Sequence, residues 1–442
     1  MPPQTIRLGT ASPSTQPTTA ATLTQLEQIA RRAAAQHIDL LLLPEAYLGG
    51  YPRGTHFGSV IGARTDAGRE EYLQYFRSAV DLGDTVGDGA GAGQAWVRRE
   101  LVGDGVTGSE TGDGVVNKRG DGTREELERI ARETGVFVVT GLIEKAGGSM
   151  YCSVVYVCPK LGIIGKRRKV MPTGTERLVW AQGSPATLQA VSTVIRGVRI
   201  NLAAAICWEN YMPLVRQSLY AQNINLYLAP TADGRDTWLP LLRTIGIEGR
   251  CFVVSSNMCV RKPLPETNGH IAHTGEHDIT VDGPHHRGRR SSVIDEDGNE
   301  IVLPDSTPSP KTSPPKPRAR RQSVFDEDGN EIVLCATDTT TTTTTSFNPF
   351  SPPTTTRLPT QPQAKQKEEF LSRGGSSITS PFGSVLAGPQ WDDPSPDSLI
   401  YADVDFDDCV RGRLDLDTGG SYSRNDSFRL EVAGLRMEAL PY

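Results

Sequence analysis

The sequence predicts a layered α/β fold, and two observations carry that prediction. Strand-like apolar runs alternate with segments of helical periodicity from residue 6 to residue 255. Several of these runs are apolar at every position, which indicates strands that are buried on both faces. The four consecutive leucines at 40–43 are the clearest case.

The chain opens on a β–α–β unit. We predict a strand at 6–11, a helix at 20–36, and a short buried strand at 39–44 that ends at a proline. The same alternation continues to residue 255. The further elements, in chain order, are a helix at 124–134, a strand at 136–140, a hairpin of 154–158 with 162–165, a strand at 198–206, a helix at 213–222, a strand at 225–229, a helix at 236–249 and a strand at 251–255.

Two regions interrupt this pattern. Residues 103–122 contain the triplet Gly-Asp-Gly three times, which is typical of a flexible surface loop. Residues 263–369 are rich in proline, serine and threonine and too polar to form a core, so we predict a long disordered insert. Within it, residues 289–303 recur almost unchanged at 320–334. We interpret the repeat as a recent duplication with one copy superfluous, or as an error in how the chain was assembled; a pair of docking motifs is the less favoured alternative.

Ordered structure is predicted to resume near Phe370. Strands are expected at 376–379 and 383–387, as a pair, and then at 399–405 and 428–432. The chain therefore divides into the first part of a domain at 1–262, the insert with its internal duplication at 263–369, and the strands that complete the same domain, with a tail, at 370–442.

Charge and apolar content exclude several classes of protein. The net charge of −6 is unfavourable for nucleic acid, whose phosphates bind basic surfaces. No run reaches the roughly 18–20 apolar residues of a membrane span. Residues 1–5 lack the basic and apolar regions of a signal peptide. We therefore expect a cytoplasmic protein, bound to no membrane, whose seven cysteines remain thiols.

Histidine is poorly placed to act as a catalytic base. Five of the seven histidines lie in 263–369, His37 ends a predicted helix, and only His56 lies near a strand end. The clustered five are weak candidates for metal ligands, because a low-complexity segment does not fix their geometry. We therefore expect neither a metal nor an organic cofactor, and a nucleophile that relies on a carboxylate or a lysine.

Cys207 is the strongest candidate nucleophile. It follows the apolar run 200–206 at a predicted strand-to-helix turn, which would expose its side chain at the edge of the sheet. Backbone N–H groups of such a turn can bind an oxyanion, and a cationic neighbour is expected to lower the pKa of the thiol. A thiol that simply completes a buried strand fits the position equally well, as at Cys152, Cys158 and Cys251.

Charged residues lie at two other strand ends. Glu45 directly follows the apolar strand at 39–44, where a carboxylate is costly unless it is paired or used. Lys169 ends a run of four cations, 166–169, just past the predicted hairpin. Three of these four cations are expected to be solvated, as in most such runs. Glu176, seven positions further on, is a second carboxylate that would hold the lysine in place.

Three segments together resemble the signatures of the nitrilase superfamily, and their order and spacing make the resemblance specific. The Cys-Trp-Glu form of the third segment is similar to true nitrilases rather than to amidases. The segments are Leu43-Pro44-Glu45-Ala46 with Gly50-Tyr51-Pro52-Arg53-Gly54, Lys166-Arg167-Arg168-Lys169 with Pro172-Thr173-Gly174-Thr175-Glu176-Arg177, and Cys207-Trp208-Glu209-Asn210-Tyr211-Met212-Pro213. The segments that resemble fungal nitrilases in particular are 121–125, 225–232 and 421–426. The likeness covers 5–262 and 370–435; it departs at the insert, at 103–122 and at Met258, where relatives commonly carry glutamine.

The resemblance implies a four-layer α-β-β-α sandwich of the carbon–nitrogen hydrolase type. It also implies a catalytic triad of Glu45, Lys169 and Cys207, with Glu176 as a further carboxylate. Members of this family form homo-oligomers, dimers that extend into larger spirals, so the same assembly is implied here.

The implied reaction is hydrolysis of a small-molecule nitrile to a carboxylic acid and ammonia. Cys207 attacks the nitrile carbon, Glu45 acts as general base, and Lys169 stabilises the developing charge together with the backbone N–H of Trp208. The rings of Trp208 and Tyr51 are expected to wall the substrate pocket, with core packing as the alternative. Competing functions are a cyanide hydratase of the same branch, an amidase, and an inactive scaffold that binds partners through its insert.

Overall fold

The computed structural model describes residues 5–60, 63–86, 94–97, 120–262 and 369–442, together with four short strands between residues 292 and 334. The chain forms two units, one of residues 1–268 with 367–442 and the other of residues 269–366. All the candidate site residues lie in the first unit. The loop expected at 103–122 lies outside the described residues, except for its last three positions.

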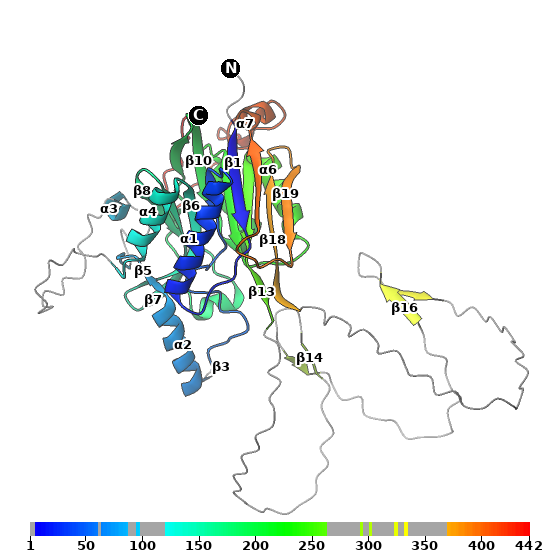
Figure 1. The fold of residues 1–442 in the computed structure, drawn as a ribbon. Helices are drawn as coiled ribbons and strands as arrows, with labels where there is room; N and C mark the ends of the chain where they lie inside the picture. The colour runs from blue at the N-terminus through cyan, green and yellow to red at the C-terminus, as the bar shows by residue number, and fades with distance from the viewer. Residues whose placement is uncertain are drawn as a thin grey trace, which may run out of the picture. The chain divides into compact units, whose positions relative to one another are not determined.

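Two seven-stranded sheets form the centre of the first unit (Figure 1). The strands of the first sheet, in spatial order, are β20 (Leu399–Val404), β1 (Ile6–Ala11), β2 (Leu40–Leu42), β6 (Phe137–Ala146), β7 (Ser149–Cys158) and β8 (Gly162–Arg168), with β5 (Val80–Asp81) beside β6. Those of the second are β13 (Cys259–Arg261), β18 (Phe370–Thr379), β12 (Phe252–Asn257), β11 (Leu226–Thr231), β10 (Val198–Ala204) and β9 (Val191–Ile195), with β19 (Val385–Trp391) beside β18. In each sheet three central strands run parallel: β1, β2 and β6 in the first, and β10, β11 and β12 in the second.

Helices and turns connect the strands of both sheets. Helix α1 begins after Thr18, whose hydroxyl accepts a hydrogen bond from the backbone N–H of Ala21 at 3.1 Å, and α4 ends at Gly135, which has a φ of 72°. The helices are α1 (Thr19–Ala35), α2 (Asp66–Ser78), α3 (Gln94–Val97), α4 (Thr123–Thr134), α5 (Pro213–Tyr220), α6 (Trp238–Gly249) and α7 (Asp407–Arg411). The 3₁₀ turns are η1 (Gly174–Leu178), η2 (Pro185–Leu188), η3 (Cys207–Tyr211), η4 (Gly412–Leu414) and η5 (Ser421–Ser423), and β3 (Ser59–Val60) pairs with β4 (Ala63–Arg64).

Three apolar clusters separate four layers. Leu40 and Leu42 of β2 lie in the same cluster as Leu202 of β10, so this cluster fills the space between the two sheets. Leu41 points the other way and packs in a second cluster with residues of α1 and α4. Ala203 of β10 lies in a third cluster with residues of α5 and α6. The predicted α-β-β-α sandwich is therefore confirmed, with α1 and α4 over the first sheet (Figure 1).

Each element predicted between residues 6 and 255 overlaps an observed strand or helix, and the strands expected at 376–405 are also present. The strand expected at 428–432 is wrong, because this segment pairs with no strand among the described residues. Phe428 is instead 71% exposed, and Val432 packs against the cluster under α5 and α6. No helix in the described part of the chain is long and apolar enough to cross a membrane.

The sequence repeat forms the same backbone structure twice. Strand β14 (Ser292–Ile294) pairs with β15 (Glu300–Val302), and β16 (Gln322–Phe325) pairs with β17 (Glu331–Leu334). The register is also the same, because the pairing of Val293 with Ile301 recurs as that of Val324 with Ile332. These hairpins are the described parts of 263–368, and the rest of the predicted insert lies outside the described residues.

The chain leaves and re-enters the second sheet at adjacent points on either side of 263–368. Strands β13 and β18 pair in antiparallel fashion, with Arg261 opposite Phe370. One residue further, the backbone N–H of Lys262 donates to the carbonyl of Glu369 at 2.9 Å. The ladder therefore continues up to the last described residue on each side.

Candidate active site

Cys207 begins the turn η3, shortly after β10 ends at Ala204, in the same kind of strand-to-helix corner that the sequence predicts. Its φ of 55° is in the left-handed region, which is uncommon for a residue with a side chain and often marks functional sites. The residue is 3% exposed. The thiol is therefore held by an unusual backbone conformation at the C-terminal end of a buried strand.

Glu45 follows β2 and is fully buried. Its Oε1 accepts hydrogen bonds from the Lys169 ammonium at 2.7 Å and from the Cys152 thiol at 3.5 Å. Its other carboxylate oxygen, Oε2, is buried and has no hydrogen-bond partner among the described residues. We call Oε2 the open oxygen of Glu45, because it is the acceptor left for a substrate, a water molecule or a thiol.

Lys169 joins the two carboxylates of the site. Its ammonium group lies 2.7 Å from Glu45 Oε1, and 2.9 Å and 2.8 Å from the two oxygens of Glu176. Glu176 is fixed by its own turn, η1, where its Oε2 accepts from the backbone N–H of Thr173 at 2.8 Å. The Tyr51 hydroxyl donates to Glu176 Oε1 at 3.0 Å, so both carboxylate oxygens of Glu176 accept hydrogen bonds.

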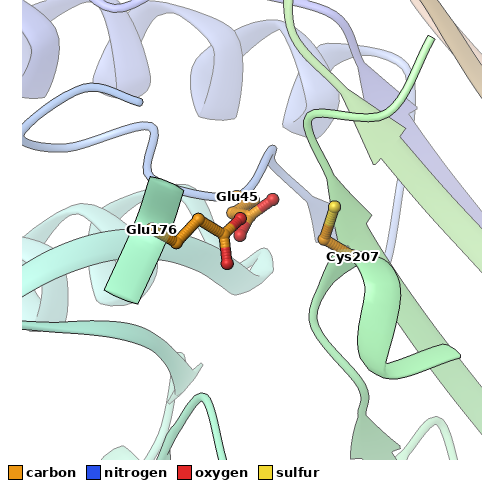
Figure 2. Close-up of side chains that lie close together, drawn as sticks. All are labelled: Glu45, Glu176 and Cys207. Carbon is orange, nitrogen blue, oxygen red and sulfur yellow. The ribbon is translucent and has the colours of Figure 1, made fainter. Parts of the chain in front are cut away.

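The predicted site residues thus meet in space. Figure 2 shows Glu45, Glu176 and Cys207 close together, with Glu176 on η1, Cys207 on η3 and Glu45 in the turn after β2. A carboxylate oxygen of each glutamate and the sulfur all lie within 4.8 Å of one another. Three such groups can also ligate a metal ion. Here the Lys169 ammonium already bonds both carboxylates, so a cation of the chain itself fills that role.

The electrostatics differ from the expectation at the thiol. Burial raises the pKa of Cys207, and the charge of Glu45 raises it further, while Lys169 and a hydrogen bond with Thr231 act against this shift. The expected lowering of the thiol pKa is therefore wrong. The cation is adjacent, but desolvation and two carboxylates outweigh it. A thiol that rests protonated needs a base to become a nucleophile.

Burial and neighbouring charges also shift the pKa values of Glu45 and Lys169. Burial raises the pKa of Glu45, an effect that the Lys169 ammonium opposes. The pKa of Lys169 is also raised, since the attraction of Glu45 and its other anionic neighbours exceeds the desolvation that disfavours its charge. Lys169 therefore remains a fixed positive charge, whereas Glu45 is a carboxylate that readily takes up a proton.

The carboxylate of Glu209 bonds to backbone N–H groups next to Lys169 and next to Cys207. Its Oε1 accepts from the backbone N–H groups of Val170 at 2.6 Å and Met171 at 3.2 Å, and its Oε2 from that of Ile206 at 2.8 Å. Arg167 donates to it at 2.7 Å. One carboxylate thus ties the residue after Lys169 to the residue before Cys207, which fixes the distance between cation and thiol.

The four cations at 166–169 are all buried, and the prediction that three are solvated is wrong. Lys166 and Arg168 point to one side of β8 and pair with Glu144, whereas Arg167 and Lys169 point to the other. None of the four is more than 2% exposed. Each has a carboxylate partner from a distant part of the chain, a fact that no local pattern contains.

Aromatic side chains lie beside Glu176 and Lys169, and another directly follows Cys207 in the chain. Tyr51 packs edge-on against Trp180 with ring centroids 5.5 Å apart, and the Lys169 ammonium lies 5.5 Å from the Trp180 centroid. Trp208 is half-buried and lies between Tyr211, 5.4 Å away, and the guanidinium of Arg235, 4.4 Å away. Tyr51 therefore contacts Glu176, which in turn bonds Lys169, whereas Trp208 directly follows Cys207 in the chain.

Other sequence candidates do not join this site. His37 and His56 are both exposed, and the remaining five histidines lie outside the described residues. The six described cysteines are all buried and none forms a disulfide. Sequence reasoning treated Cys152 as an ordinary strand thiol, although it contacts Glu45. The signal for this contact is the pairing of β7 with β8, which brings Cys152 beside Lys169.

Comparison with known proteins gives a consistent family. The chain matches the family model described as carbon-nitrogen hydrolase over residues 5–309. It is 32% identical over 413 residues to an aliphatic nitrilase of Sinorhizobium fredii, covering 93% of this chain and 90% of the relative. An arylacetonitrilase of Trametes versicolor is 29% identical over 420 residues, covering 93% and 91%. A solved carbon-nitrogen hydrolase of Helicobacter pylori shares the fold, with a TM-score of 0.51, 12% identity and coverage of 96% of this chain and 97% of that one.

Proposed function

The chain belongs to the carbon–nitrogen hydrolase family and is an enzyme of the nitrilase type, and from this premise we propose that it hydrolyses a small organic nitrile to the carboxylic acid and ammonia. Cys207 is the nucleophile in this proposal, Glu45 the general base and Lys169 the fixed cation. The observation that carries it is the open oxygen of Glu45. It is a buried acceptor without a partner among the described residues, in a trio whose atoms lie within 4.8 Å.

The first step is addition of the thiol to the nitrile. The open oxygen of Glu45 takes the thiol proton as the sulfur bonds to the nitrile carbon, and the proton passes to the nitrile nitrogen to give a thioimidate. The raised pKa of Cys207 makes this base necessary, because burial and the charge of Glu45 keep the resting thiol protonated. Lys169 and the backbone N–H of Trp208 stabilise the negative charge that develops on nitrogen.

Hydrolysis of the thioimidate completes the reaction. Glu45 activates a water molecule, which adds to the same carbon. The former nitrile nitrogen then leaves as ammonia, which gives a thioester on Cys207. A second water hydrolyses the thioester, which releases the acid and restores the thiol. Lys169 carries most of the charge stabilisation, so Lys169→Ala is expected to lower kcat roughly 100- to 1,000-fold, as loss of an oxyanion donor does.

The test is a panel of phenylacetonitrile, benzonitrile, an aliphatic dinitrile and cyanide, with ammonia and acid release measured for each. We expect acid and ammonia from at least one organic nitrile and only background release from Cys207→Ala. Cys251→Ala is the matched control, because Cys251 is an equally buried thiol in a different apolar cluster. Turnover that survives Cys207→Ala would refute the mechanism. Formamide from cyanide as the main product would make the enzyme a cyanide hydratase, and folded protein that converts nothing would favour the scaffold.

Two further expectations from the sequence remain predictions. The first is a homo-oligomer, which light scattering on the purified chain would measure. The second is a cytoplasmic location, which fractionation of the source cells would measure.

A further inference from the structure

A second thiol lies against the proposed base. The Cys152 sulfur lies 3.5 Å from Glu45 Oε1, and both residues are fully buried. Burial and the nearby charge of Glu45 raise the pKa of Cys152, so this thiol keeps its proton and donates it in a hydrogen bond. The reaction proposed above does not use Cys152, although it contacts the residue on which every proton transfer depends.

The backbone of Cys152 also contacts the cation of the triad. Its carbonyl accepts a hydrogen bond from the backbone N–H of Lys169 at 2.7 Å. One residue of β7 therefore touches both Glu45, through its side chain, and Lys169, through its main chain. The ammonium of Lys169 returns to Glu45 Oε1 at 2.7 Å, which closes a ring of three contacts.

We propose that Cys152 is a positioning residue, whose thiol holds Oε1 of Glu45 and so reserves the open oxygen for the proton of Cys207. The inference rests on the proposed role of Glu45 as general base. A carboxylate with both donors on one oxygen cannot rotate without breaking two hydrogen bonds. With Lys169 as the only donor, the same rotation breaks one, and the ammonium can follow either oxygen.

The same hydrogen bond stabilises the ionised form of Glu45. The titratable or charged groups that influence one another at this carboxyl are Lys169, Glu176, Cys207, Cys152, Tyr51 and Tyr75. Burial raises the pKa of Glu45, and within this set the opposing influences are the Lys169 ammonium and the Cys152 thiol. Loss of the thiol proton donor therefore raises the pKa of Glu45 further, and the base is lost at a higher pH.

Strand β7 supplies a matched control. Cys152 and Cys158 lie on the same face of the strand, both packed in the cluster between the sheets, but only Cys152 bonds Glu45. The variants are Cys152→Ala, Cys152→Ser and Cys158→Ala in the full chain. A serine hydroxyl restores a donor at the same place, while Cys158→Ala removes an equivalent volume from the core without touching the site.

The measurement is the acid limb of kcat/KM against pH on a nitrile that the unmodified enzyme converts. For Cys152→Ala we expect the limb to move up by roughly 0.5–1 pH unit, since a thiol is a weak donor but its acceptor is charged. Cys152→Ser is expected to return the limb to its original position, and Cys158→Ala not to move it. An unmoved limb in Cys152→Ala, or the same shift in Cys158→Ala, would overturn the inference while leaving the proposed function intact.

A second readout does not depend on nitrile turnover. Iodoacetamide alkylates Cys207 as the thiolate, so the rate at each pH reports whether Glu45 can take its proton. Peptide mass mapping separates this site from the other six cysteines. The same order of variants is expected, with Cys152→Ala displaced to higher pH. If nitriles are inert and this displacement is present, the proposed substrate is wrong and the positioning role stands.

Discussion

Glu144 of β6 and Glu45, just after β2, are two buried glutamates that each bond a lysine of the run 166–169. They differ in how their carboxylate oxygens are used. Each carboxylate oxygen of Glu144 accepts two hydrogen bonds. Lys166 and Arg168 donate to its Oε1, while Arg168 and Ser153 donate to its Oε2. Glu45 has two donors, both on Oε1, and its other oxygen is open.

The pKa values follow the same division. The Glu144 carboxyl is fully buried, yet its cationic partners outweigh desolvation and lower its pKa to about 2. Burial is not outweighed at Glu45, whose pKa is raised. A saturated carboxylate is held in one protonation state and serves the fold, whereas a carboxylate with an open oxygen can exchange a proton. We therefore propose that Glu144 has a structural role and Glu45 a catalytic one.

The largest effect is expected from Glu45→Gln. An amide cannot take the thiol proton, so kcat/KM should fall about 100- to 10,000-fold, the usual contribution of a general base. The free energy of unfolding should change little, because Lys169 keeps its bonds to Glu176. Steady-state kinetics and urea denaturation of the same preparation measure both quantities. Activity within tenfold of the unmodified enzyme would break the assignment.

Glu144→Gln should show the reverse of Glu45→Gln, with lower stability and nearly unchanged activity. Lys166 and Arg168 would keep their charges in a buried place with Asp84 as their remaining anion, which should lower the free energy of unfolding by about 3–5 kcal/mol. Turnover per folded molecule, counted by titration of Cys207 with iodoacetamide, should stay within a few-fold. A variant as stable as the parent but inactive would place Glu144 in the chemistry.

Acid should reduce the difference in the free energy of unfolding between the parent and Glu144→Gln. A carboxylate with a lowered pKa stabilises the fold above its ordinary value of 4.5 and loses this contribution as pH falls towards 2. The gap in the free energy of unfolding should therefore be full at about pH 7 and smaller at about pH 3. Urea midpoints of both proteins across this range measure it. A gap that is constant, or that grows in acid, would contradict the lowered pKa.

The smallest effect is expected from Tyr51→Phe. This change removes one hydrogen bond to Glu176, whose oxygens keep Lys169 and the backbone N–H of Thr173. We expect about 1 kcal/mol of lost stability and a few-fold lower kcat/KM. Tyr72→Phe is the control, since Tyr72 packs on Phe57 outside the triad. A loss as large as that of Glu45→Gln would mean that Tyr51 touches the reacting atoms.

The sequence predicted the elements whose signal is local. Helix α1 has clear periodicity and a capping threonine, and the leucines of β2 form a strand buried on both faces. Helix α2 was missed because it is highly charged and buries only Gly68, which leaves little periodicity to detect. At 428–432 the alternation typical of a strand is present, but no strand in the described part of the chain pairs with this segment.

The site was predictable in its membership and not in its electrostatics. Three motifs placed Glu45, Lys169 and Cys207 at strand ends, and the structure brings them together. The burial of 166–169 depends on partners as distant as Asp84, Glu144 and Glu209, which no window of sequence contains. The raised pKa of Cys207 likewise depends on desolvation and on two carboxylates from other parts of the chain. The nearby cation considered alone therefore predicted a lowered pKa, which is the wrong direction.

The adjacent positions of Lys262 and Glu369 have a consequence for engineering. Since β13 and β18 stay paired up to these residues, the two ends of the intervening segment are held together by one backbone hydrogen bond. Loop-closure entropy grows only slowly with length, so the excursion can be shortened to a tight turn or replaced by a foreign domain. This edge of the sheet is therefore a suitable site for inserting another domain.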